Sequence, residues 1–291
     1  MSLAYLWPAL AGLLYAVAAI LTKRALAEGA GVARFSFVCN AIMFVLFLLP
    51  ALTAWEGPIW SELGWPLLGG GLFFLGQLFT IAAIRVGDVS VQSPLMGSKV
   101  LFVAIISVAT GAEAVPPDWW AGAGLTALAV FLLGFSNWRG GRRTWLGVGL
   151  ALASAAAFAM CDVLVMAKAK SFGVANYLAV VMGVQLLLSF TLLPLFRQPL
   201  RAIPKTAWPW LLVAGAGMGV QAILMNIALG HYGNATAFNI IYSTRGLWSV
   251  LLIWVGGSLV GNIELRAAPG LIVRRMAGAL LLLGAVALLL I

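Results

Sequence analysis

Charged residues are scarce in this sequence. Asp, Glu, Lys and Arg make up only 9% of the 291 residues, whereas 63% are hydrophobic. A soluble domain carries about 25% charged residues. A chain with so few charges cannot hide its apolar surface from water, so the composition predicts a protein whose solvent is lipid. No long hydrophilic insert is present, which argues against an additional soluble domain.

Acidic side chains and histidine are scarcer still. The chain has eight Asp and Glu residues and a single histidine, His231. One histidine excludes a His-rich metal site, and no Ser-His-Asp set, Walker loop or dinucleotide fingerprint occurs. The two cysteines, Cys39 and Cys161, lie in apolar segments without metal-ligand spacing and are interpreted as buried thiols. We therefore expect no enzyme activity, no cofactor and no metal.

Apolar runs of about 20 residues, the length that crosses a bilayer core of about 30 Å, are abundant instead. Short segments with Gly, Pro or charge connect them, and tryptophans gather near their ends, as in an interfacial belt. The expected fold is an all-α integral membrane protein with ten transmembrane helices. The expected spans are Leu3–Leu21, Phe35–Ala54, Trp65–Ile84, Val89–Thr110, Trp119–Asn137, Trp145–Ala167, Asn176–Phe196, Trp208–Leu229, Thr236–Val260 and Ile272–Ile291.

The ten spans form two similar sets of five. A shift of 146 residues places Gly87 on Gly233 and Lys99 on Arg245. Because each set has an odd number of spans, the two copies are expected to have opposite orientations in the membrane. Such an inverted repeat is typical of secondary transporters, whose binding site lies between the halves. The predicted repeats are residues 1–138 and 145–291.

Positive charge is distributed unevenly among the connections. The odd-numbered connections, together with Arg274 and Arg275 at the start of the tenth span, hold thirteen Lys and Arg residues, whereas the even-numbered connections hold only Lys168 and Lys170. An excess of Lys and Arg marks cytoplasmic connections, so this count places both termini outside the cytoplasm. The net charge of +9 is therefore attributed to loops that face anionic headgroups, and nucleic acid is not expected as a partner.

Two cations lie deep inside predicted spans, where a charge costs about 2.5–3.5 kcal/mol on insertion scales. Lys99 and Arg245 each lie roughly ten residues into their span, too deep to reach an interface easily. Their matched positions predict a pair of cations that face a central cavity and bind an anionic group of a substrate. The alternative is that each cation forms an ion pair with a protein carboxylate.

Asp162 is the only acid well inside a predicted span. It is a candidate for the carboxylate that couples transport to a proton or a cation. It is equally a candidate for the fixed counter-ion of Lys99 or Arg245. If it neutralises one of them, one net positive charge remains, which suits a carboxylate or a zwitterion better than a dianion.

Uncharged polar side chains in the spans complete the candidate substrate site. They either line a cavity or hydrogen-bond neighbouring helices, which contributes on the order of 0.6 kcal/mol each. Gln92 is expected to share a helical face with Lys99. Asn239 and Tyr242 are expected to share a face with Arg245 in the same way. The third and eighth spans add two further candidates, Gln77 and Gln221.

Residues that loosen a helix precede both cations. Gly87 and Pro94 come before Lys99, and Gly233 comes before Arg245. Glycine and proline weaken a helix, so these three residues are expected to let helix ends bend during gating.

The two five-span halves, the segment GDVSVQSP that opens the fourth span, Glu113 just beyond it and the glycine-rich fifth and tenth spans form a recognisable pattern. With these features the sequence resembles the drug/metabolite transporter superfamily, specifically its EamA-type ten-helix members. The resemblance implies a secondary transporter in the cytoplasmic membrane that moves a small metabolite by alternating access, with export of amino acids or related carboxylates as the first expectation. It also implies cytoplasmic termini, contrary to the charge count. The second half departs from the pattern, since Ile240 replaces the proline equivalent to Pro94.

Two other functions remain open. One is transport of a cationic or lipophilic compound bound by Asp162, with Lys99 and Arg245 in structural roles. The other is a membrane protein without transport activity, either an embedded enzyme or a lipid-interacting scaffold. The shortage of acids and histidines counts against the enzyme, and the matched buried cations count against the scaffold. The expected partners are a small-molecule substrate and the lipid bilayer, and the chain is expected to be a monomer.

Overall fold

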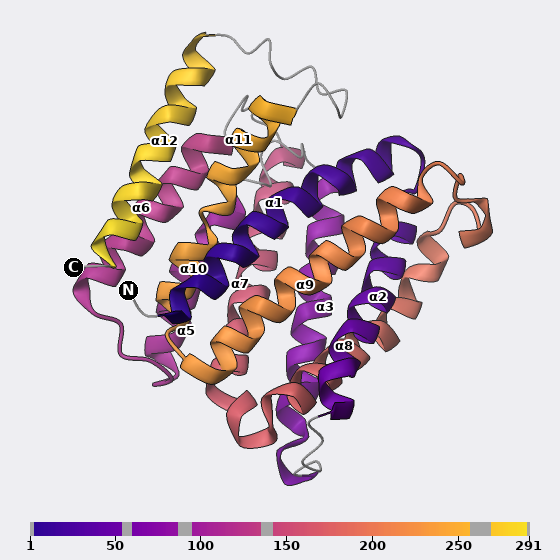
Figure 1. Cartoon of the computed structure of the whole chain (residues 1–291), viewed down its shortest axis with the longest axis horizontal. Helices are drawn as coiled ribbons and strands as arrows, with labels where there is room; N and C mark the ends of the chain where they lie inside the picture. The colour runs from indigo at the N-terminus through magenta and orange to yellow at the C-terminus, as the bar shows by residue number, and fades with distance from the viewer. Residues whose placement is uncertain (1–2, 54–59, 87–94, 135–141, 257–268, 290–291) are drawn as a thin grey trace.

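The protein is described by a computed structural model that covers residues 3–53, 60–86, 95–134, 142–256 and 269–289 (Figure 1). Within those residues every regular element is a helix, either α or a short 3-10 segment. The all-α prediction is confirmed for this part of the chain.

The helices of the first half are α1 (Leu6–Ala27), α2 (Val32–Thr53), α3 (Gly64–Val86), α5 (Lys99–Ala109) and α6 (Pro117–Gly134). Those of the second half are α7 (Arg142–Phe172), α8 (Val174–Ser189), α9 (Trp208–Tyr232), α10 (Ala235–Tyr242), α11 (Arg245–Gly256) and α12 (Pro269–Leu288). The 3-10 segments are η1 (Leu3–Tyr5), η2 (Trp60–Glu62), η3 (Met96–Ser98), η4 (Phe190–Leu195) and η5 (Leu200–Ala202).

Six helical stretches in the described residues are long and apolar enough to cross a membrane. They are Leu3–Ala27, Val32–Thr53, Trp60–Ala83, Trp145–Phe172, Val174–Leu195 and Trp208–Tyr232. Three shorter apolar helices accompany them: Met96–Ala109, Pro117–Leu133 and Met276–Leu288. Large apolar side chains such as Leu187 and Leu280 are exposed on the outside of the bundle, where a soluble protein would carry polar groups. These features are those of a multi-pass membrane protein.

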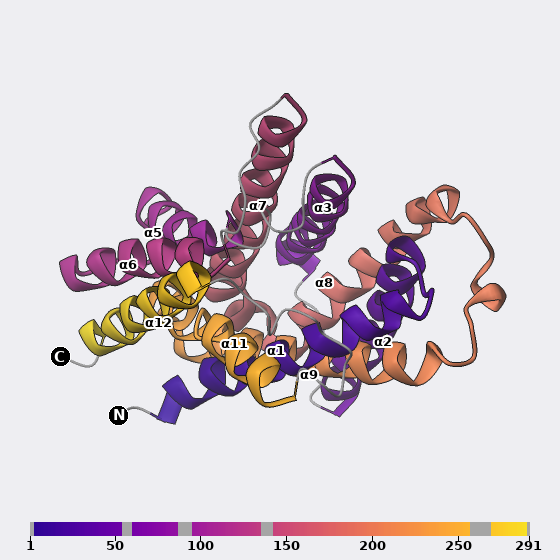
Figure 2. The ribbon, with the colours of Figure 1, turned by 90° about the horizontal axis from the view of Figure 1, so that it is seen from above.

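Helices from the two halves of the chain pack against each other in matched pairs. The most extensive packing joins α3 with α7 and α1 with α9, and α6 runs beside α12 (Figures 1 and 2). Likewise, α5 contacts α7 and α11 contacts α1. The counterparts of α1, α3 and α5 in the other half are α7, α9 and α11. When each helix is exchanged for its counterpart, the contact of α3 with α7 becomes that of α9 with α1, and the contact of α5 with α7 becomes that of α11 with α1. The two halves are therefore interleaved rather than separate.

Small residues let these helices approach closely, as in other membrane bundles. On α12, a Cβ added to Gly278 would lie 2.8 Å from the carbonyl oxygen of Ala129 on α6. On α6, a Cβ added to Gly122 would lie 3.4 Å from the carbonyl oxygen of Ala285 on α12. One glycine of the expected fifth span and one of the tenth thus each lie close to the backbone of the opposite helix of this pair.

The expected ninth span, Thr236–Val260, is not one helix. The helix α10 ends at Tyr242, a turn follows, and α11 begins at Arg245. The hydroxyls of Ser243 and Thr244 donate to the carbonyl oxygens of Asn239 (2.8 Å) and Ile241 (2.7 Å). Such bonds compete with backbone hydrogen bonding and favour a turn over a continued helix. The predicted shared face of Asn239, Tyr242 and Arg245 is therefore wrong, because no single helix carries all three.

Two other span boundaries also differ from those expected. The helix α7 extends over Arg142–Phe172, beyond the expected Trp145–Ala167 at both ends. The helix α8 ends at Ser189 and continues as the 3-10 segment Phe190–Leu195, which contains Pro194. Proline lacks the N–H that an α-helix needs, which accounts for the change of helix type at this point.

Candidate functional site

Each of the two cations in the spans begins a helix. Lys99 is the first residue of α5 and follows the 3-10 segment η3, in which the Ser98 hydroxyl donates to the carbonyl oxygen of Leu95 (2.6 Å). Arg245 is the first residue of α11 and follows the turn at Ser243 and Thr244. Both cations therefore stand where regular α-helix gives way to another backbone conformation. Interrupted helices of this kind form the binding sites of many secondary transporters.

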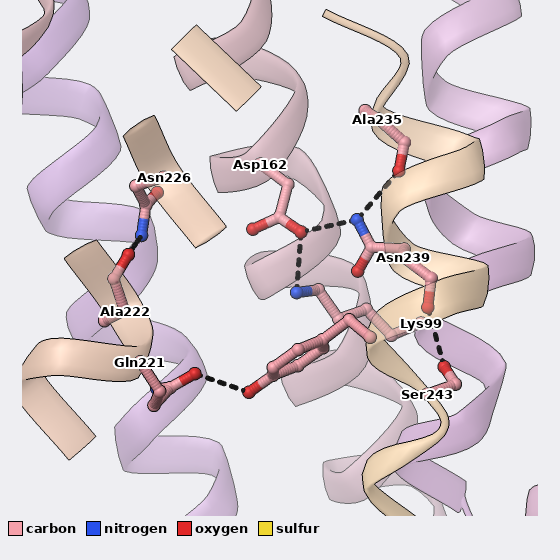
Figure 3. A network of polar contacts seen from close by, with 9 residues as sticks. Lys99, Asp162, Gln221, Ala222, Asn226, Ala235, Asn239 and Ser243 are labelled. Atoms are coloured by element: carbon pink, nitrogen blue, oxygen red, sulfur yellow. Dashed lines mark hydrogen bonds and ion pairs between the residues drawn. The ribbon is translucent and has the colours of Figure 1, made fainter. Parts of the chain in front are cut away.

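Lys99 forms an ion pair with Asp162 (Figure 3). The distance from Lys99 Nζ to Asp162 Oδ2 is 2.7 Å, and the two side chains are only 13% and 12% exposed. The Asn239 amide nitrogen donates to the same carboxylate oxygen at 2.8 Å and to the carbonyl oxygen of Ala235 at 3.0 Å. The three side chains come from α5, α7 and α10, so the group joins the two halves of the chain.

The ion pair with Asp162 neutralises the charge of Lys99 but not that of Arg245. A buried charge is costly unless it is paired and hydrogen-bonded. Asp162 satisfies that requirement for Lys99, and Asn239 holds the carboxylate in place. Of the two alternatives for Asp162, the geometry is that of a fixed counter-ion of Lys99. The expected pair of equivalent free cations is not present in this structure, because Lys99 is neutralised.

Arg245 lies between two tyrosine rings. Its Cζ atom is 4.5 Å from the ring centroid of Tyr15 on α1 and 4.6 Å from that of Tyr242 on α10. The two rings meet edge to face with centroids 6.0 Å apart. Among the described residues, no carboxylate forms an ion pair with Arg245. Cation–π contacts stabilise a guanidinium without neutralising it, so this partly buried side chain keeps a full positive charge.

Tyr242 connects Arg245 to the eighth expected span. Its hydroxyl donates to Oε1 of Gln221 on α9 at 2.9 Å, and the Gln221 amide nitrogen donates to the carbonyl oxygen of Met218 at 3.0 Å. One turn further along α9, the Asn226 amide donates to the carbonyl oxygen of Ala222 (2.8 Å; Figure 3). The structure therefore brings together Arg245, Tyr242 and Gln221.

Gln77 belongs to a different polar cluster. Its amide exchanges two hydrogen bonds with the amide of Asn40, at 2.8 and 3.0 Å. Asn40 also donates to the Ser189 hydroxyl (2.6 Å) and accepts from the Gln185 amide (2.9 Å). This cluster links α2, α3 and α8, and none of its hydrogen bonds reaches Lys99, Asp162 or Arg245. The structure therefore gives Gln77 a role between packed helices.

Of the four remaining candidates, the structure describes only Gly233. Gln92, Gly87 and Pro94 lie outside the described residues. Gly233 ends α9 with φ of 73°, a conformation that favours glycine. Asn234 follows with φ of 56° and leads into α10.

Glu113 connects the two halves near that turn. Its Oε2 atom accepts hydrogen bonds from the backbone N–H (3.2 Å) and the hydroxyl (2.8 Å) of Thr236, in the first turn of α10. A carboxylate at a helix N-terminus is favourable because it meets the positive end of the helix dipole. Glu113, from the loop before α6, therefore fixes the start of the helix that carries Asn239 and Tyr242.

Two groups of the site carried little signal in the sequence. Tyr15 lies in the first expected span, and nothing in its spacing connects it to Arg245. No motif in the sequence predicts the contact of Thr236 with Glu113. Within the described ranges, no group of three or more His, Cys, Asp and Glu side chains is arranged to hold a metal ion.

Comparison with known proteins identifies a fold but no family. No protein-family model matches this chain, and no curated protein matches it. One solved crystal structure of a protein superposes with a TM-score of 0.80 at 17% sequence identity, over 99% of this chain and 96% of that chain. At that identity the likeness shows a shared fold over the whole chain.

Proposed function

We propose that this protein is a secondary transporter of the drug/metabolite transporter superfamily, of the EamA type. It moves a small carboxylate-bearing metabolite, of which amino acids are the first class to test, out of the cell across the cytoplasmic membrane. The observation that carries this proposal is the environment of Arg245. Its guanidinium is partly buried between two tyrosine rings and has no carboxylate partner among the described residues.

The proposed architecture is ten transmembrane helices in two inverted repeats. The matched contacts of α3 with α7 and of α1 with α9 support it, because a two-fold relation between the halves produces such pairs. The positions of Lys99 and Arg245 at the starts of α5 and α11 support it as well. In this architecture the substrate site lies between the halves, near the middle of the membrane.

The two cations have different roles in the proposed mechanism. Arg245 binds the substrate carboxylate, since a guanidinium presents a planar fork of N–H donors that matches a carboxylate. Tyr242 and Gln221 hold that fork in place through the ring contact and the hydrogen bond to Gln221. Lys99, Asp162 and Asn239 form a neutral group that ties the halves together while the transporter rearranges.

A cationic substrate bound by Asp162 is the less favoured alternative. Lys99 and Asn239 already occupy its Oδ2 atom, so a cation would have to displace Lys99 and leave it buried without a counter-ion. No contact in the described part of the chain favours that exchange.

Ligand-induced thermal stabilisation of the purified protein tests the proposal. At 100 times its dissociation constant, a ligand stabilises a protein by about 2.7 kcal/mol. We expect an amino acid or another carboxylate to raise the melting temperature of the wild type, and Arg245→Gln to abolish that increase. Arg245→Lys keeps the charge but loses the planar fork of N–H donors, so the affinity of this variant for the carboxylate should fall about 10-fold or more. Arg24→Gln is the matched control, because Arg24 also lies over an aromatic ring, that of Trp210, but outside the candidate site.

The same screen can contradict the proposal. Stabilisation by organic cations alone, unchanged in Arg245→Gln and lost in Asp162→Asn, would assign the site to Asp162 instead. Uptake of the stabilising compound into proteoliposomes then separates transport from simple binding.

A further inference from the structure

The connection between η4 and α9 presents a cluster of positive charge. Arg197, Arg201 and Lys205 are all exposed, and the sequence from 196 to 207 contains no acidic residue. We call these three residues the basic platform. On the inner side of the same connection, Ile203 and Ala207 are buried, at 3% and 0% exposure. The connection therefore has an apolar side toward the protein and a cationic side facing outward.

The basic platform is held in a defined position. Arg34 at the start of α2 donates to the carbonyl oxygen of Pro199 (3.4 Å) and to that of Gly29 (2.8 Å). A Cβ added to Gly29 would lie 3.4 Å from the ring of Pro204. Arg34 on α2 and Gly29 in the loop between α1 and α2 thus contact the connection and hold it in place. The three cations are carried by a braced segment rather than by a loose loop.

Near the basic platform, the acid of the described α1–α2 loop already has a partner. Glu28 is the acidic residue of the neighbouring α1–α2 loop, and it forms an ion pair with Arg24 at 2.6 Å. Arg24 also lies over the ring of Trp210, with Cζ 5.8 Å from the centroid. The acid is therefore already neutralised, and the positive charge of the basic platform remains available to an anion from outside the protein.

The surroundings of the basic platform mark the level of lipid headgroups. Trp208 and Trp210 begin α9 directly after it, and Trp210 is 38% exposed. Tryptophan is enriched at the membrane–water interface, where headgroups lie. A cationic surface at that depth meets phosphates before it meets any soluble anion. Anionic phospholipids attract such residues with a free energy of roughly 1 kcal/mol for each Lys or Arg near the surface.

The opposite end of the bundle differs in charge. There, Glu113 binds Thr236 near the ends of α9 and α7, and Asp118 is exposed at the start of α6. Lys168 at that end lies over the Trp65 ring, with Nζ 4.5 Å from the centroid. The exposed acid Asp118 thus lies at this end, whereas the described acid beside the basic platform, Glu28, is paired with Arg24. Only one of the two leaflets can be contacted by the basic platform.

We propose that Arg197, Arg201 and Lys205 form a docking surface for the headgroups of anionic phospholipids in the cytoplasmic leaflet. This inference is independent of the transported substrate. It places the connection before α9 on the cytoplasmic side, which agrees with the charge count along the sequence and differs from the cytoplasmic termini that the family resemblance implies. Bound lipid would hold the start of α9, the helix that also carries Gln221.

A lipid titration of the purified protein in a neutral detergent tests the docking surface. The probes are phosphatidylglycerol, phosphatidylcholine of the same acyl chains and inorganic phosphate, and the readout is the melting temperature. Phosphatidylglycerol should raise the melting temperature of the wild type, and the other two should not. In the variant Arg197→Gln/Arg201→Gln/Lys205→Gln, the phosphatidylglycerol concentration that gives half of the rise in melting temperature should increase on the order of 100-fold. This figure is the product of about 5-fold for each of the lost charges.

Two control variants keep the result interpretable. Arg197→Lys/Arg201→Lys preserves the charge and should titrate like the wild type, which separates charge from local packing. Lys170→Gln removes an exposed cation at the other end and should also titrate like the wild type. The docking surface would be refuted if the triple variant responded to phosphatidylglycerol like the wild type, or if phosphatidylcholine acted equally well. An equal effect of inorganic phosphate would also refute it, by showing a site for a free anion.

Discussion

Lys99 and Asp162 form a buried ion pair, with 2.7 Å between Nζ and Oδ2, although they come from different halves of the chain. Asn239 donates to the same oxygen, so three helices meet at one carboxylate. The pair neutralises one of the two matched cations, whereas Arg245 forms no ion pair with a carboxylate among the described residues. The predictions below follow from this arrangement and from the packing around it.

Breaking the ion pair on one side should destabilise the protein strongly. Asp162→Asn leaves the Lys99 ammonium buried without a counter-ion, which costs about 3–5 kcal/mol of unfolding free energy. The double variant Lys99→Met/Asp162→Asn removes both charges and should recover most of that loss. A double-mutant cycle of unfolding free energies in detergent measures the coupling. Independent, additive effects of the two substitutions would show that the pair is not formed.

Tyr242 should contribute separately through its hydroxyl and its ring. Tyr242→Phe removes the hydrogen bond to Gln221 and should lower the unfolding free energy by about 1 kcal/mol. Because the ring stays over Arg245, carboxylate binding should change little in this variant. Tyr242→Leu removes the ring as well and should weaken binding markedly more. Paired measurements of unfolding and of the carboxylate titration distinguish these roles; equal binding by both variants would argue against the ring contact.

Two adjacent glycines on α3 should respond in opposite ways to alanine. A Cβ at Gly70 would lie 2.6 Å from Cβ of Val184 and 2.7 Å from the carbonyl oxygen of Val181 on α8. Gly70→Ala should therefore destabilise the protein by about 1–3 kcal/mol through overpacking. Gly71→Ala meets no atom within 4 Å and should be neutral or slightly stabilising, since alanine favours helix. Melting temperatures of both variants test this contrast, and an equal loss in both would contradict the packing of α3 on α8.

The carboxylate of Glu113 should stabilise the start of α10. Glu113→Ala removes the acceptor for the N–H and the hydroxyl of Thr236, and hydrogen bonds to a charged group are each worth about 1.5–3 kcal/mol. Glu113→Gln keeps an acceptor oxygen and should cost clearly less. Hydrogen exchange at the amides of α10 reports the effect locally, with the amides of α12 as an internal reference. Unchanged exchange in Glu113→Ala would show that the contact does not hold the helix.

Three charged residues of the candidate site can be identified from the sequence alone. Lys99, Arg245 and Asp162 stand out because charges inside apolar runs are rare and costly. The match of Lys99 with Arg245 under a shift of 146 residues indicated that the two positions are equivalent. Which cation Asp162 neutralises was left open, because that depends on how α5, α7 and α11 pack.

Local chemistry explains the errors at element boundaries. The apolar run from Thr236 to Val260 predicts one span, yet the hydroxyls of Ser243 and Thr244 bond to backbone carbonyls and end α10 early. On the neighbouring helix, Gly12 leaves room for this turn, since a Cβ there would lie 3.1 Å from the carbonyl oxygen of Tyr242. That fit between α1 and the turn is a tertiary property, which a hydropathy pattern does not contain.

The sequence by itself determined that the protein is helical and membrane-embedded, because composition and the length of apolar runs depend on the residues alone. It also determined that charge inside the bundle is confined to a few positions. Only the tertiary structure decided that Lys99 is neutralised by Asp162, that Gln77 joins Asn40 instead, and that Tyr15 and Tyr242 enclose Arg245. The physical reason is that each of these contacts joins helices that are distant along the chain, and the packing of the two halves selects which side chains meet.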